Sequence, residues 1–131
     1  MFHFGLEEFK NYIAMAFREE ELRKWEPMIA SFIEEQRPRE EIRSQVDLDY
    51  SIDIDDQSIE IFEIRPRWNS PDEKVKIPIS KTKWVRRQRV WKIYWQRADM
   101  NWHKYDPLPQ TDALKEFIEE LKEDPYACFW G

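Results

Sequence analysis

The chain has 131 residues, of which 15% are aromatic and 37% are charged, and its formal net charge is -6. This length fits a single domain over residues 1–131, and the aromatic content excludes a disordered chain. No apolar run is long enough to span a bilayer, no signal segment follows Met1, and the lone Cys128 cannot form an intramolecular disulfide. We therefore expect a cytoplasmic protein with no membrane partner.

The charges fall into blocks along the chain. Residues 1–73 carry nine Lys/Arg and nineteen Asp/Glu, residues 74–98 carry nine Lys/Arg and no acid, and residues 99–131 carry three and eight. Opposite charges that face each other across a sheet stabilise it modestly, so an acidic strand beside a basic one accounts for this pattern. An external anionic partner is the alternative, which the overall negative charge disfavours.

Two N-terminal segments have helical periodicity. Residues 6–24 are predicted to form an amphipathic helix, because apolar residues recur there at helical spacing. Pro27 suits the first turn of a second short helix that ends before Pro38. Its buried face would consist of Met28, Ile29, Phe32 and Ile33. A single kinked helix over both segments is the alternative, and the sequence does not separate the two.

The period then changes to two residues, which indicates strands. Four are predicted, over residues 46–54, 59–65, 75–85 and 90–96. Pro66 ends the second strand, and Pro78 places the third at an edge or a bulge, because proline cannot donate to a ladder. The connections are short, so the strands form an antiparallel meander.

A last helix follows, and the chain ends in an aromatic tail. Thr111 or Asp112 can cap this helix, and Asp124-Pro125 ends it. Its apolar stripe consists of Leu114, Phe117, Ile118 and Leu121. The tail over residues 126–131 is expected to dock on the body. The fold class is therefore α+β: an N-terminal helix or helix pair, a four-stranded antiparallel meander, and a C-terminal helix with a docked aromatic tail.

Two sets of residues suggest catalysis, and neither does so strongly. Aspartates that share one face of the first strand (Asp47, Asp49, Asp53 and Asp55), next to Glu63-Ile64-Arg65, faintly resemble a metal-dependent phosphodiester hydrolase. Such enzymes use acid-x-Lys, and arginine cannot replace that lysine, so a solvated strand face is the better interpretation. Cys128 and His103 could form a nucleophile and base, but the apolar neighbours of Cys128 would raise its pKa. One Cys and two His also lack zinc-ligand spacing, so we predict no metal, cofactor or catalytic residue.

Basic and aromatic residues interleave between Lys83 and Arg97. Sheets that bind single-stranded nucleic acid stack bases on exposed aromatics and pair phosphates with Lys and Arg. The alternation of Trp91, Ile93 and Trp95 fits a buried face equally well. We favour the core interpretation, because the whole chain is acidic, and keep nucleic-acid binding as an alternative.

The segment after the fourth predicted strand concentrates polar and aromatic side chains. It contains Arg97, Asp99, Trp102, His103 and Tyr105 within nine residues. A structural corner would explain them, with Arg97 paired to Asp99 or Glu63 and Trp102 covering the sheet end. Loops with this chemistry also often carry binding sites, and His103 could respond to pH.

Several segments of the chain resemble an uncharacterised bacterial family, domain-of-unknown-function family number 3024. They are Arg43-Ser44-Gln45, residues 58–68, Trp91–Trp95, Arg97-Ala98-Asp99, residues 102–107 and the ending Cys128-Phe129-Trp130-Gly131. The similarity covers roughly residues 29–131 and is strongest over the last forty. Met100-Asn101 stands where Leu-Lys is expected, and Ala127 where Gly is expected. The resemblance implies no activity.

We conclude from the sequence that the function is open and that a non-catalytic binding or interaction module is favoured over an enzyme. A candidate ligand site would form where Glu63, Arg65 and Trp68 approach the segment after the fourth strand. In that site Arg65 and Arg97 would hold a carboxylate or phosphate, and His103 would be a pH-sensitive contact. The site residues are Glu63, Arg65, Trp68, Arg97, Asp99, Trp102, His103 and Tyr105. The sequence does not reveal the ligand, partners or oligomeric state.

Overall fold

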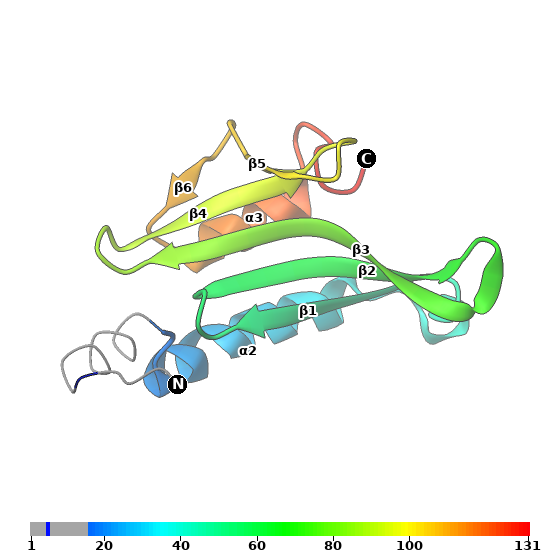
Figure 1. Cartoon of the computed structure of the whole chain (residues 1–131), viewed down its shortest axis with the longest axis horizontal. Helices are drawn as coiled ribbons and strands as arrows, with labels where there is room; N and C mark the ends of the chain where they lie inside the picture. The colour runs from blue at the N-terminus through cyan, green and yellow to red at the C-terminus, as the bar shows by residue number, and fades with distance from the viewer. Residues whose placement is uncertain (1–4, 6–15) are drawn as a thin grey trace.

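The computed structural model describes Gly5 and residues 16–131, so most of the helix predicted over residues 6–24 lies outside the described residues. With the labels of Figure 1, the elements are α2 (Glu19–Gln36), a short 3-10 helix η1 (Glu40–Ile42), β1 (Asp47–Asp53), β2 (Ser58–Arg67), β3 (Ser70–Val85), β4 (Val90–Gln96), β5 (Trp102–Lys104), β6 (Gln110–Thr111) and α3 (Leu114–Glu123).

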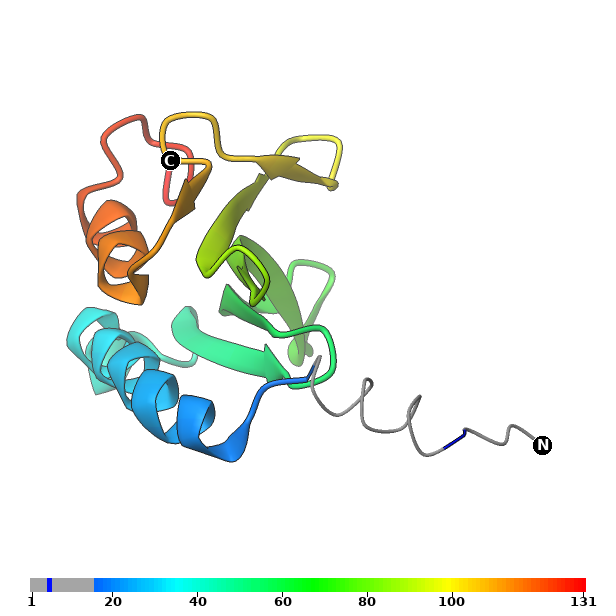
Figure 2. The ribbon, with the colours of Figure 1, turned by 90° about the vertical axis from the view of Figure 1, so that its left-hand side faces the viewer.

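The strands form one antiparallel sheet with both helices on the same face. The strand order is β1-β2-β3-β4-β5, and the two-residue β6 also pairs with β4. Figure 2 shows α2 and α3 side by side against the concave face of the curved sheet. The predicted α+β class is therefore confirmed. In the part of the chain that the structure describes, no helix covers the other face of β1 to β4.

The sheet has six strands where four were predicted. Strands β5 and β6 are three and two residues long, too short to show a period in the sequence. Strand β2 also continues through Pro66 to Arg67, because the β2–β3 ladder shifts register directly after the proline. At Pro78 the ladder has another shift, between Ile61 and Phe62, which confirms the bulge predicted for this proline.

Helix α2 runs without a break from Glu19 through Pro27 to Gln36, so the prediction that a second helix begins at Pro27 is wrong. Residues 16–18 are not helical, so a single helix over both predicted segments does not form either. The proline lies on the exposed side of the helix, where the loss of one backbone donor is tolerated because water can replace it. Ile29, Phe32 and Ile33 are buried on the other side as predicted, whereas Met28, also predicted there, is only partly buried.

Four aromatic rings fasten α2 to the sheet. The Trp25 ring centroid lies 4.9 Å from that of Trp84 on β3 and 4.8 Å from that of Trp91 on β4. Phe17, just before the helix, packs 6.0 Å from both Trp25 and Trp91. Trp91 is 1% exposed, which places it in the core, as the alternation in the sequence suggested.

The C-terminal tail docks on the body as expected. Phe129 is buried and packs against Tyr105, with ring centroids 4.7 Å apart. Asp124 ends α3 in a left-handed conformation, and its carboxylate accepts the N–H groups of Phe129 and Trp130. The N-cap of α3 is Ala113 rather than Thr111 or Asp112. Thr111 instead accepts the N–H of Ala113 from two residues away.

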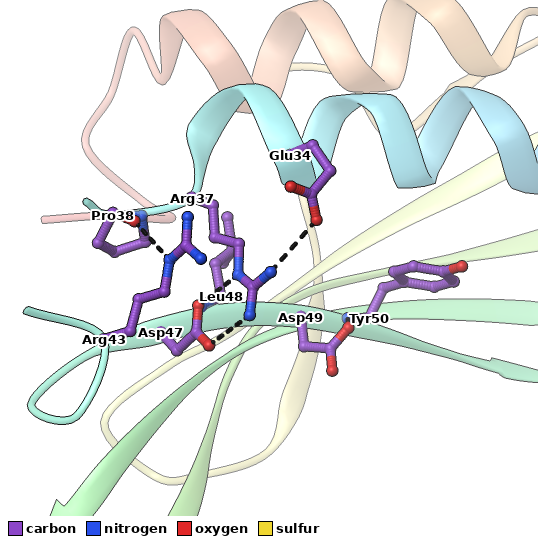
Figure 3. A network of polar contacts seen from close by, with 8 residues as sticks. All are labelled: Glu34, Arg37, Pro38, Arg43, Asp47, Leu48, Asp49 and Tyr50. Atoms are coloured by element: carbon purple, nitrogen blue, oxygen red, sulfur yellow. Dashed lines mark hydrogen bonds and ion pairs between the residues drawn. The ribbon is translucent and has the colours of Figure 1, made fainter. Parts of the chain in front are cut away.

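Ion pairs hold the two ends of α2 to the sheet. Near its start, Glu21 accepts hydrogen bonds from both terminal nitrogens of Arg86, in the β3–β4 turn. At its end, Arg37 donates to both carboxylate oxygens of Asp47 on β1 at 2.9 Å, and Figure 3 shows this bidentate pair beside Glu34. Both contacts join residues far apart in the sequence, so they fix the direction of the helix across the sheet.

The Arg37–Asp47 pair makes stability depend on pH. The hydrogen bonds from Arg37 lower the pKa of Asp47 below its usual value. A depressed folded-state pKa means that the stabilisation is complete above the unfolded-state value of about 3.9 and is lost as the pH falls through the lower folded-state value. We expect Asp47→Asn to cost about 1–2 kcal/mol at pH 7 in urea denaturation and to make the acid decline shallower. Asp72→Asn, at an exposed carboxylate, serves as the control. Equal acid profiles for Asp47→Asn and the unchanged protein would contradict this role.

Candidate functional site

The predicted corner is a tight turn between β4 and β5. The N–H of Met100 donates to the carbonyl of Arg97 at 2.8 Å, and Met100 has a φ of 64°. Asp99 accepts the N–H of Asn101 with one oxygen and lies 2.7 Å from Nε2 of His103 with the other. These contacts lower the pKa of Asp99, chiefly through the Asn101 N–H. The turn therefore holds an Asp–His pair at the surface.

Arg97 does not pair with Asp99 or Glu63, contrary to the structural interpretation of the sequence. Its guanidinium lies over the ring of Trp95, 5.3 Å from the ring centroid. Asp99 is engaged with His103, and Glu63 with Arg65, which explains the difference. Among the described residues no carboxylate forms an ion pair with Arg97, so this guanidinium remains available on an aromatic support.

Tyr105 and Trp102 belong more to the body than to the surface. Tyr105 is 0% exposed, and its hydroxyl donates to Glu120 on α3 at 2.8 Å. Burial, and then the neighbouring Glu120, raises the pKa of Tyr105. Trp102 is half-buried and pairs with Gln96 across the β4–β5 ladder. The Tyr105 hydroxyl thus links the sheet edge to the last helix.

The other predicted site residues lie on β2 and on a two-stranded arm. The β1 ladder ends at Ile64 and the β4 ladder ends at Ser80, so beyond these points β2 and β3 pair only with each other (Figure 1, right). Arg65 pairs with Glu63 at 3.1 Å, and Trp68 at the arm's turn is 91% exposed. Within the part of the chain that the structure describes, no hydrogen bond or ion pair joins these three residues to the β4–β5 turn.

Both groups border the C-terminal tail. Glu63 and Trp130 line one small hollow, while Arg97 lies close enough to Cys128 to oppose the rise in its thiol pKa. Burial, and then Asp124, raises that pKa. A thiol with a raised pKa is a poor nucleophile at neutral pH.

The aspartates of β1 do not gather with Glu63. Asp53 pairs with Ser58 at one end of the β1–β2 ladder, whereas Glu63 pairs with Leu48 near the other. Glu63 lies five positions along β2 from Ser58, a span of about 17 Å. In the described residues no group of three or more His, Cys, Asp or Glu side chains is placed to hold a metal ion.

The basic-aromatic stretch is divided between the two faces of the sheet. Trp84 and Trp91 are buried beneath α2, so they offer no stacking surface. Tyr94 alternates with these core residues and faces away from the helices, directly between Lys81 on β3 and Lys104 on β5. Of the aromatic residues considered for stacking bases, the half-buried Tyr94 between two lysines is therefore the one placed on the face away from the helices.

One hollow at the surface was not predicted from the sequence. It encloses about 680 Å³ at the end of the sheet opposite the arm, between the β1–β2 turn and the β3–β4 turn. Trp84 and Val85 supply apolar wall, Lys83, Arg86 and Arg87 supply positive charge, and residues 55–57 close the other side. Only the interleaving of basic and aromatic residues around Trp84 pointed to it.

Two buried donors beside this hollow have no acceptor among the residues that the structure describes. They are Nε1 of Trp84 and Nε of Arg86, whose terminal nitrogens are already engaged by Glu21, Gln57 and the carbonyl of Ala16. A buried donor without a partner costs about 1–3 kcal/mol, so such groups are rare in folded proteins. Both belong to side chains that line the hollow.

These features define a two-layer α+β protein in which the described helices lie on one face of the sheet. The chain belongs to the family described as "Domain of unknown function (DUF3024)", whose model matches residues 17–131. Comparison with curated proteins and with solved structures finds no match. None of the helices within the described residues is long and apolar enough to cross a membrane.

The buried hydroxyl of Tyr105 yields a stability prediction. Tyr105→Phe removes the donor to Glu120 and should lower the free energy of unfolding by about 1–2 kcal/mol in urea denaturation. Tyr126→Phe is the matched control, because Tyr126 is 66% exposed. Equal stability of the two variants would show that the Tyr105–Glu120 bond contributes nothing.

Proposed function

We propose that this protein is a non-catalytic binding module for a small anion with an apolar body, and that the hollow between the two turns is its principal site. The observation that carries the proposal is the pair of buried donors, on Trp84 and Arg86, that lack an acceptor. Both are donors, so the missing partner is an acceptor such as a carboxylate or phosphate oxygen. A ligand oxygen in the hollow could engage them after a small rotation of either side chain.

The size and lining of the hollow support such a ligand. Small-molecule sites typically enclose about 300–1,000 Å³, with apolar walls and a few convergent polar groups. The 680 Å³ of this hollow lies within that range, and its lining combines Trp84 with three cationic residues and two aspartates, Asp55 and Asp56. Lys83 is already paired with Asp56 at 2.9 Å. Arg87 is exposed and forms no ion pair with a described residue, so it can make the first contact with an anion.

The absence of catalysis is part of the proposal. Of the polar groups in the described chain, Cys128 has a raised pKa and the Asp99–His103 pair has no nucleophile in contact. A cytoplasmic location and a bacterial origin also stay predictions of the sequence.

The hollow can be tested with naphthalene-2-carboxylate as the probe, measured by calorimetry and by quenching of tryptophan fluorescence. We expect Arg87→Gln to weaken binding about tenfold, because a charge-assisted hydrogen bond is lost. Arg89→Gln is the control, since Arg89 lies in the same turn but does not line the hollow. The uncharged amide of the probe should bind more weakly than the acid. Equal affinities for the two variants, or for acid and amide, would refute this site.

The β4–β5 turn is a second candidate site, for a carboxylate or phosphate. The specific observation is that Arg97 is held on Trp95 and has no carboxylate partner among the described residues, with His103 opposite Trp95 in the ladder. Glu63, Arg65 and Trp68 belong to this proposal as predicted from the sequence. Single-stranded nucleic acid along Tyr94 and metal-assisted hydrolysis remain alternatives with less support.

Phosphate titration monitored by NMR tests the second site. Arg97→Gln should abolish the phosphate-dependent shifts of the β4–β5 turn, and Arg97→Lys should restore them only in part, because lysine lacks the planar fork. Arg65→Gln tests the arm, and a comparable loss there would show that both predicted groups contact the anion. Unchanged shifts in Arg97→Gln would eliminate this site.

A further inference from the structure

The outer edge of β1 is a free sheet edge with defined limits. Alternate residues of an antiparallel strand direct both backbone groups to the same side. The N–H groups of Leu48 and Tyr50 donate to the carboxylates of Asp47 and Asp49 rather than to β2. The backbone N–H and C=O groups of Leu48, Tyr50 and Ile52 therefore point away from β2. At one end of this edge, the N–H of Phe17 donates a hydrogen bond to the carbonyl of Ile54. At the other end the carboxylate of Asp47 is held by Arg37.

Between those ends, the outward backbone groups of β1 can become available to a further strand. The carboxylate of Asp49 is exposed and forms no ion pair with a described residue, so it can leave the N–H of Tyr50 without breaking another contact. Ile52 has no neighbouring aspartate that covers its outward N–H. The stretch from Tyr50 to Ile52 therefore offers backbone donors and acceptors to an additional strand.

A groove runs beside this edge. Two adjoining hollows of about 450 and 480 Å³ lie between α2 and β1, and both are lined by Leu22, Glu26 and Tyr50. The Tyr50 hydroxyl donates to Glu26 at 3.0 Å across the groove. Ile52 extends the apolar floor, and the carboxylates of Glu26 and Asp49 supply negative charge, while Glu19 is paired with Arg23.

We propose that this edge and groove bind an extended basic peptide, which adds to β1 as a further strand. Its backbone pairs with Tyr50 and Ile52, its alternate apolar side chains enter the groove beside α2, and its Lys or Arg side chains, on the opposite face of the strand, meet Asp49. An extended peptide that adds to a sheet edge gains affinity from main-chain bonds and specificity from pockets for every second side chain. This site is separate from both anion sites proposed above.

The charge of the edge determines the partner. A second copy that paired through its own β1 would bring Asp49 and Asp53 against the same residues, and like charges directly opposite each other destabilise a sheet. An acidic peptide would meet the same repulsion. A basic peptide instead exchanges the Asp49–Tyr50 contact for an ion pair and a backbone hydrogen bond.

The first test uses a blocked hexapeptide of alternating Lys and Val with two N-methylated forms, one methylated at the Val amides and one at the Lys amides. NMR titration should show shifts at Tyr50–Ile52. The form whose methyl groups face β1 should bind about tenfold more weakly, because it loses backbone hydrogen bonds to β1. The form whose methyl groups face the solvent should keep its affinity. No shifts at the edge, or equal effects of the two methylations, would overturn strand addition.

A charge exchange provides the second test. Asp49→Lys should weaken binding of the Lys-Val peptide and permit binding of a Glu-Val peptide of the same length. Asp106→Lys, an exposed substitution on the segment after β5, is the matched control and should change neither. Arg87→Gln should leave peptide binding intact, so failure of the hollow and failure of this edge are distinguishable. An Asp49→Lys variant that keeps its preference for the basic peptide would refute the proposed contact.

Discussion

The packing of Trp25 against Trp84 and Trp91 is the interaction on which the rest of the structure depends. Three indoles whose centroids lie 4.8 to 5.2 Å apart join α2 to β3 and β4 at one end of the sheet. Aromatic rings bury large apolar areas, so a cluster of this size is a principal source of tertiary stability. This packing positions α2 so that Glu21 pairs with Arg86 and the helix lies alongside β1. The groove beside β1 and the hollow between the turns depend on the same position of the helix.

The sequence predicted the parts of the fold in which apolar residues repeat over several turns or pairs. Strand β4 has the predicted bounds, and the buried faces of α2 and α3 are those predicted, because each repeats over at least two turns or three pairs. Strands β5 and β6 could not be predicted, since their pairing is set by β4 rather than by their own pattern. The extension of β2 through Pro66 depends on a register shift, which only the partner strand reveals.

The parts of the candidate sites that depend on contacts local in the sequence were predictable, and the parts that depend on distant contacts were not. Asp99 and His103 lie within one turn, so the sequence analysis could place both in the same candidate site. The placement of Arg97 over Trp95 was missed, because the sequence suggested two carboxylate partners and both have closer ones. The hollow is built from turns about thirty residues apart, and no local motif marks such a meeting. Its basic and aromatic residues were noticed, but their common position was not predictable.

The bulge beside Pro78 constrains the length of β3. Because Ile79 has no partner in the β2–β3 ladder, Pro78 lies opposite Phe62 and the next pair joins Ile77 to Glu63. In this register Lys76 faces the ring of Phe62, with its amine 4.5 Å from the ring centroid. Directly opposed residues share one face of the sheet, so the bulge accommodates Ile79 while the pairs beyond it, including Lys76 with Ile64, stay matched. Over this stretch β3 therefore contains one residue more than β2, and Lys76 keeps its place on the face that carries Phe62.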